Sequence, residues 1–152
     1  MQTNSTRSGN PAFRQGLLFG ILLGIFTIVY NVILSLAGLS TLFIGAIMLV
    51  YTGSGILSSI VGFIVAMLAY LVAGIRATRQ TGRMGTGALA GLWTALIGAV
   101  ITWVYALLFY VTAPTIAAPP LSVMGLDSIL SIALTMLFGA VIGALGGLFR
   151  RR

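Results

Sequence analysis

The side chains that could do chemistry in this chain are few, and most of them are arginines. The 152 residues include eight arginines and one acid, Asp127, with neither histidine nor cysteine. Guanidinium groups pair with phosphate and carboxylate groups, so contact with anionic lipid headgroups is the chemistry that this set supports. Metal binding, proton shuttling and nucleophilic catalysis need residue types or pairs that are missing. We therefore expect no cofactor, no metal and no enzymatic activity.

The arginines stand at the ends of long uncharged stretches. No charged residue occurs between Arg14 and Arg76, or between Arg83 and Asp127. The chain is 59% hydrophobic and only 6% charged, whereas a soluble domain carries roughly 25% charged residues. This composition excludes a soluble protein. It also makes the net charge of +7 a signal of membrane topology rather than of nucleic-acid binding.

The elements that position these side chains are four apolar stretches, each near the 20 or so residues that a membrane-spanning helix needs. They predict an all-α polytopic protein with four transmembrane helices in two hairpins. We expect a disordered cytoplasmic tail over 1–13 and a single domain over 14–152. The predicted spans are 16–38, 55–75, 87–112 and 128–149.

Arginine placement sets the expected orientation. An even number of spans puts all eight arginines on one side of the membrane, which is the cytoplasmic side by the positive-inside rule. Both termini and the segment 76–86, interpreted as a hairpin loop, should then be cytoplasmic, and no ionisable side chain should lie inside a span. Six arginines are candidates for contact with anionic headgroups: Arg76, Arg79, Arg83, Arg150, Arg151 and Arg152.

Two segments on the expected outer side are less regular. The apolar run 42–51 is only ten residues long and precedes the glycine-rich "TGSG". It is interpreted as a short re-entrant or interfacial helix, or else as an extension of the second helix. Asp127 or Ser128 is placed to cap the fourth helix at its N-terminus.

Small residues recur three or four positions apart within the spans and so lie on one face of each helix. Such faces let membrane helices pack closely, and we expect the four faces to meet one another or a partner. The glycines predicted at helix–helix contacts are Gly16, Gly20, Gly24, Gly87, Gly91, Gly98, Gly139 and Gly143.

Toward the outer side the same faces become polar. We expect these groups to hydrogen-bond between helices, each bond contributing about 0.6 kcal/mol; the alternative is a polar cleft that opens outward. The residues concerned are Thr27, Asn31, Ser35, Ser59, Thr102, Ser131 and Thr135.

The two halves of the chain resemble each other in glycine spacing. Gly16, Leu18 and Gly20 match residues 87, 89 and 91 at an offset of 71, which predicts a parallel pseudo-repeat. The segment "AGIRATRQTGRMGTGALAGL", with the closing "GALGGLFRRR", resembles a group of small bacterial four-helix membrane proteins of unknown function. That resemblance covers most of residues 14–149 and implies the fold and a bacterial origin, but no activity.

These observations favour a non-enzymatic protein of the bacterial cytoplasmic membrane, a glycine-packed bundle that serves as a structural or accessory subunit. Its expected partners are anionic lipids, further copies of itself or a larger membrane complex, and not nucleic acid. The alternative is a small channel or carrier for a neutral or lipid-like ligand, which would use the outward-facing polar cleft.

Overall fold

The computed structural model describes residues 10–36, 53–112 and 121–148, and these residues form four α-helices. They are α1 (Pro11–Leu36), α2 (Gly53–Thr81), α3 (Met84–Thr112) and α4 (Leu121–Leu148). Each contains a stretch long and apolar enough to cross a membrane, and the described residues include no strand. The chain is thus an all-helical, multi-pass membrane protein, as the sequence predicts.

Local sequence explains where α1 begins. The Asn10 side chain accepts a hydrogen bond from the backbone N–H of Ala12 (3.1 Å), which satisfies one of the amides left free at a helix start. Pro11 occupies the first helical position, where its fixed φ and missing N–H cost nothing. Residues 11–13, assigned from the sequence to the tail, therefore belong to α1, while 1–9 lie outside the described residues.

A two-residue turn, rather than the predicted loop over 76–86, joins α2 to α3. The helix continues to Thr81 because no glycine or proline interrupts residues 75–81. Gly82 then adopts φ +71° and donates its N–H to the Thr78 carbonyl (2.8 Å), an arrangement that ends helices at glycine. The Thr86 hydroxyl contacts both the Thr81 hydroxyl and the Arg83 carbonyl, which links the two helices across the turn.

The prediction that Asp127 or Ser128 caps the fourth helix is wrong. α4 begins at Leu121, so Asp127 is its seventh residue and stands within the helix. The last proline of the preceding segment is Pro120, and nothing after it prevents helix formation. The segment 42–51 lies outside the described residues, and α2 begins just beyond it at Gly53.

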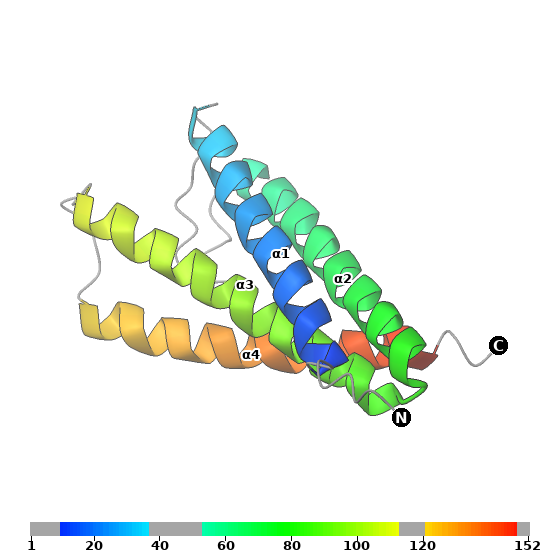
Figure 1. Cartoon of the computed structure of the whole chain (residues 1–152). Coiled ribbons are helices and arrows are strands. Elements are labelled where there is room, and N and C mark those ends of the chain that lie inside the picture. The colour runs from blue at the N-terminus through cyan, green and yellow to red at the C-terminus, as the bar shows by residue number, and fades with distance from the viewer. Residues whose placement is uncertain (1–9, 37–52, 113–120, 149–152) are drawn as a thin grey trace, which may run out of the picture.

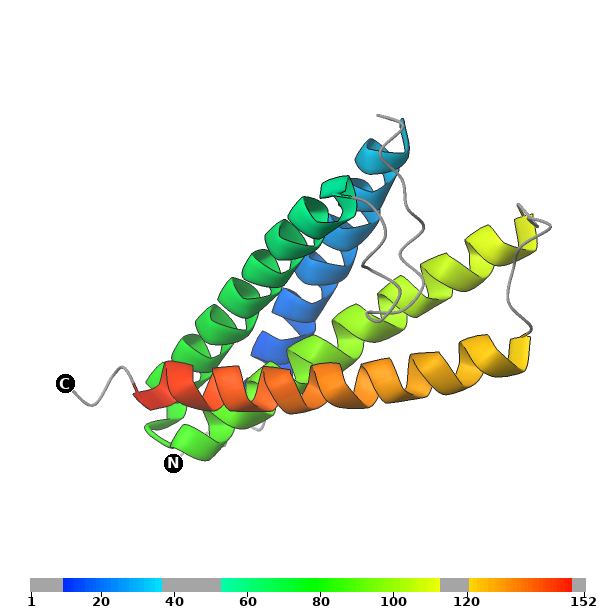
Figure 2. The same cartoon turned by 180° about the vertical axis from the view of Figure 1, so that it is seen from behind.

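The helices form two pairs that diverge from a common end (Figure 1). The start of α1, the α2–α3 turn and the end of α4 lie together at this end, which we call the turn end. From there α1 and α2 run in one direction and α3 and α4 in another, as the view from behind also shows (Figure 2). Helix α3 contacts each of the other three, whereas over the described residues α1 and α4 do not meet.

The core is small and consists mainly of small side chains. One buried cluster near the turn end contains Ala12, Ala73, Ala77 and Ala90. A second contains Leu23, Tyr70, Ala95 and Ile142. Most large apolar side chains instead point outward, as expected for helices whose outer faces meet lipid rather than water. Burial of bulky side chains therefore does little to hold this bundle together, and backbone proximity carries more of the packing.

Candidate functional site

The closest helix contact in the molecule joins α3 to α4 through glycine. A Cβ added to Gly91 would collide with the carbonyl oxygen of Gly139, and one added to Gly143 would collide with that of Gly87. A Cβ on Gly139 would lie 2.7 Å from the Cβ of Ala95. The two backbones are in direct contact here, and no larger residue fits at Gly91 or Gly143 without moving a helix.

Helix α1 packs on α3 in a different way. Its glycines form a shallow groove that receives side chains spaced one turn apart. A Cβ on Gly20 would lie 2.7 Å from Ile97 Cβ, and one on Gly24 would lie 2.8 Å from Ile101 Cγ2. Gly16 stands against Trp93, whose ring meets Phe13 edge-on at a centroid distance of 5.1 Å.

The contact between α2 and α4 uses glycines that were not among the predicted site residues. A Cβ on Gly74 would collide with the Gly143 carbonyl, and a Cβ on Gly146 would lie 2.6 Å from the Leu71 carbonyl oxygen. A signal for Gly74 is present in the sequence, since Gly74 and Thr78 are small residues one turn apart. Gly62, which lies on the proposed small-residue face of α2, has nothing within 4 Å of an added Cβ.

The predicted packing glycines thus lie at two helix contacts, α1–α3 and α3–α4, and Gly74 of α2 joins the second at Gly87 and Gly143. Among the predicted glycines Gly98 has the loosest contact, since the nearest atom to its added Cβ is Leu23 Cδ2 at 3.3 Å.

The polar side chains of the far half bond within their own helices. Thr27 donates to the Leu23 carbonyl (2.8 Å) and Asn31 to the Thr27 carbonyl (2.8 Å). Thr102 donates to the Gly98 carbonyl (2.9 Å) and Thr135 to the Ser131 carbonyl (2.7 Å). Each bond runs from residue i to residue i−4, so these groups are satisfied without a second helix.

These bonds matter for the predicted polar cleft, because four of the groups that would line it already bond within their own helices. Thr27, Asn31, Thr102, Ser131 and Thr135 are half-buried, and the hydrogen bonds just described do not join one of them to another across helices. The side chains of Ser35 and Ser59 lie outside the described residues. The sequence predicts that these groups bond between helices; the three threonine hydroxyls and the Asn31 amide instead donate along their own helices.

The described arginines lie toward the turn end, and three of them belong to helices long and apolar enough to cross a membrane. Arg14 lies in the stretch Pro11–Leu34 of α1, and Arg76 and Arg79 lie in the stretch Ile60–Thr81 of α2. These stretches are defined by length and composition, so the absence of ionisable side chains from the membrane interior stays a prediction. Both helices extend past the uncharged stretches, since the long aliphatic stems of arginine can lie along apolar surface.

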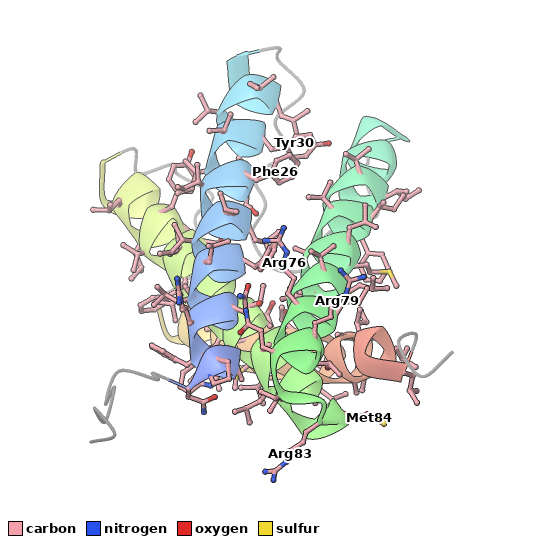
Figure 3. The ribbon with its side chains drawn as sticks, turned by 45° about the vertical axis from the view of Figure 1, so that its right-hand side comes forward. Phe26, Tyr30, Arg76, Arg79, Arg83 and Met84 are labelled. Carbon is pink, nitrogen blue, oxygen red and sulfur yellow. The ribbon has the colours of Figure 1, made fainter. Side chains whose placement is uncertain are left out.

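The three described headgroup candidates differ in their surroundings. Arg83 projects from the turn, whereas Arg76 projects into the space between α1 and α2 (Figure 3). The guanidinium of Arg76 lies over the Phe19 ring, 5.4 Å from its centroid. Arg76, Arg79 and Arg83 are all exposed, and 150–152 lie outside the described residues.

No family model, curated protein or solved structure matches the chain. The likeness to small four-helix bacterial proteins is therefore a resemblance in glycine spacing alone, and the function must be argued from the packing and charge described above.

Proposed function

We propose that this protein is a non-enzymatic structural or accessory subunit of a membrane assembly, built as a rigid glycine-packed unit. The observation that carries the proposal is the backbone contact among Gly87, Gly91, Gly139 and Gly143. This contact leaves no space between α3 and α4 at these glycines for a substrate or a moving ion.

A helical bundle that packs rigidly at one end and diverges at the other has a shape suited to a scaffold. Glycine costs about 1 kcal/mol of helix propensity relative to alanine, so repeated glycines require a compensating contact. Close backbone packing in lipid is such a contact, and it fixes the relative positions of α2, α3 and α4. The diverging pairs then present long apolar faces to the membrane, including Leu22, Phe63 and Leu137, which are more than half exposed.

The proposal also covers how the protein is oriented and in which membrane it lies. The arginine-rich turn end faces the cytoplasm under the positive-inside rule, and the membrane is the bacterial cytoplasmic membrane. Anionic lipids and either further copies of the chain or a larger membrane complex are the proposed partners.

The test is purification of the tagged full chain in mild detergent from its own membrane, followed by mass measurement. The proposal expects a particle of fixed composition, heavier than the 15.9 kDa chain with its detergent and lipid. The Gly143→Leu variant should lose that composition, whereas Gly62→Leu should keep it.

The alternative function is a small channel or carrier, and the same preparation distinguishes it. A lone monomer that lets small neutral solutes cross reconstituted vesicles would overturn the accessory role in favour of transport. The expected result is an assembly whose vesicles are no leakier than protein-free ones.

A further inference from the structure

Arg76 is a cation in an unusual position for a membrane helix. It stands five residues before Thr81, so its Cα lies about 7 to 8 Å inside the end of α2. Because the Cα–Cβ bond leans toward the N-terminus of its helix, the side chain starts away from the turn end and toward the membrane interior. Figure 3 shows it between α1 and α2, with Phe26 and Tyr30 projecting from α1 farther from the turn.

The contacts of Arg76 hold the guanidinium in place without neutralising it. The Phe19 ring beneath it, 5.4 Å away, offers a cation–π contact. The chain has one acid, Asp127, which is the seventh residue of α4 and therefore near the opposite end of the molecule from the turn (Figure 1). A charged group at this depth calls for a counter-charge, and residues 10–36, 53–112 and 121–148 supply none near Arg76.

A second polar group on the same side of α1 lacks a partner. Gln15 stands one turn from Phe19 on the same face of the helix. Its Oε1 is buried and accepts no hydrogen bond among the described residues. A buried, unsatisfied amide is costly in an apolar setting. Since the residue as a whole is only half-buried, a rotation of the amide would let Oε1 accept a hydrogen bond from a hydroxyl outside the bundle.

We propose that the α1–α2 face at Arg76, Phe19 and Gln15 binds one anionic phospholipid of the leaflet at the turn end. The lipid phosphate pairs with the Arg76 guanidinium, a headgroup hydroxyl donates to Gln15 Oε1, and an acyl chain lies along the stacked rings of Phe26 and Tyr30, whose centroids are 5.6 Å apart. This site does not depend on the accessory role proposed above.

A phospholipid fits these features better than a free anion does. The cation is exposed on a helix face that meets the bilayer, where lipid is the abundant source of phosphate. Farther from the turn end than Arg76, the neighbouring side chains are apolar and aromatic. Such side chains pack against an acyl chain but give a small hydrated anion nothing to bind.

The proposal is tested on the delipidated full chain in detergent by native mass spectrometry. The chain is titrated with phosphatidylglycerol and, separately, with phosphatidylcholine of the same acyl chains. We expect one phosphatidylglycerol to bind first and more tightly than the rest. In R76Q this first step should weaken at least about fivefold, the factor that corresponds to ~1 kcal/mol for a basic side chain at an anionic membrane surface.

R83Q is the matched control, because Arg83 carries the same charge at the exposed turn. It should weaken the first binding step clearly less than R76Q does, and phosphatidylcholine, whose ammonium offsets its phosphate charge, should lose less affinity in R76Q than phosphatidylglycerol does. An unchanged first step in R76Q, or an equal loss in R83Q, would overturn the site. Displacement of the lipid by millimolar inorganic phosphate would likewise overturn it, since it would assign the cation to a soluble anion.

A second measurement needs no substitution and so does not depend on whether R76Q folds. Phosphatidylglycerol with a photoreactive acyl chain is crosslinked to the wild type in vesicles and the attachment sites are mapped. Attachment to α1 residues on the Phe26–Tyr30 side is expected in excess over the same probe with a choline headgroup. Equal attachment from the two headgroups, or attachment confined to other helices, would contradict the proposal.

Discussion

The turn end and the far end of this bundle use similar residues to different effect. At the turn end Gly87 and Gly91 of α3 meet Gly139 and Gly143 of α4 so closely that no Cβ fits between them. At the far end the helix pairs diverge (Figures 1 and 2). Toward that end the polar residues of the same faces, such as Asn31 and Thr102, bond to their own helices.

The difference shows under which conditions a helix face of small residues packs against another helix. A glycine face holds two helices together only where the facing helix brings its own backbone, or a matching side chain, within reach. A hydroxyl can satisfy itself on the preceding turn and does not need the neighbouring helix. The contrast between Gly91 and Gly62, which faces open space, makes the point within one chain.

The largest expected effect concerns which side of the membrane each end occupies. We predict that Gln80→Cys, on exposed α2 surface near the turn, is labelled by an impermeant thiol reagent only from the cytoplasm. Thr115→Cys, between α3 and α4 in the sequence, should be labelled only from outside. Because the chain has no native cysteine, each label reports one position. Labelling of residue 80 from outside intact cells would mean that the turn end faces outward, contrary to the prediction.

The next effect is on stability at the turn end. Gly143→Leu introduces a side chain where both Gly87 and Gly91 already touch the backbone. We expect a loss near 3 kcal/mol in the free energy of unfolding, the upper part of the range for overpacking. Denaturant unfolding in one detergent measures it. Gly62→Leu serves as the control, and equal stability of the two variants would remove the distinction between paired and open glycines.

A smaller loss is expected where the nearest atoms to a glycine belong to a side chain instead of the backbone. Gly20→Leu meets Ile97 Cβ at 2.7 Å and the Thr94 carbonyl oxygen at 3.1 Å, so the two backbones lie farther apart here than at Gly143. We expect about 1 to 2 kcal/mol in the same assay. Leu22→Ala, at a position that is 55% exposed, should cost less, and a larger loss at Leu22 than at Gly20 would mean that α1 presents a different face to the bundle.

The smallest effect is predicted at two threonines whose hydroxyls bond within their own helices. Thr27→Val and Thr135→Val each remove a hydroxyl that bonds only to its own helix in the contacts described here. We expect a change of less than about 0.6 kcal/mol, the mean for interhelical polar pairs in membranes. A loss above 1.5 kcal/mol at either threonine would show that these hydroxyls join helices after all, as the sequence alone suggests.

The sequence predicts the helices better than it predicts their partners. Apolar length and uncharged runs identify four spans, and the glycine spacing selects Gly20 and Gly143 as unusual positions. Spacing does not predict which helices pack together. Gly16, Gly20 and Gly24 meet side chains of α3, whereas Gly143 meets the backbone of Gly87 and Gly91. That assignment depends on how the helices cross, which hydrophobic periodicity does not encode.

Charged residues are a poor guide to the helix ends of this chain. The arginines between two apolar runs predict a loop over 76–86, yet α2 continues to Thr81. The place of Asp127 before the fourth apolar run predicts a cap, yet α4 begins directly after Pro120. The position of Arg76 over Phe19 depends on how α1 and α2 sit side by side, and no residue pattern predicts it.

The central claim, that the backbones of α3 and α4 touch at the turn end, is tested most directly by one pair of alanine substitutions. Alanine is the better helix former by about 1 kcal/mol, so Gly62→Ala should leave the free energy of unfolding unchanged or raise it. Gly91→Ala should lower it, because the added methyl would collide with the Gly139 carbonyl oxygen. A Gly91→Ala variant as stable as Gly62→Ala would contradict the contact and the account built on it.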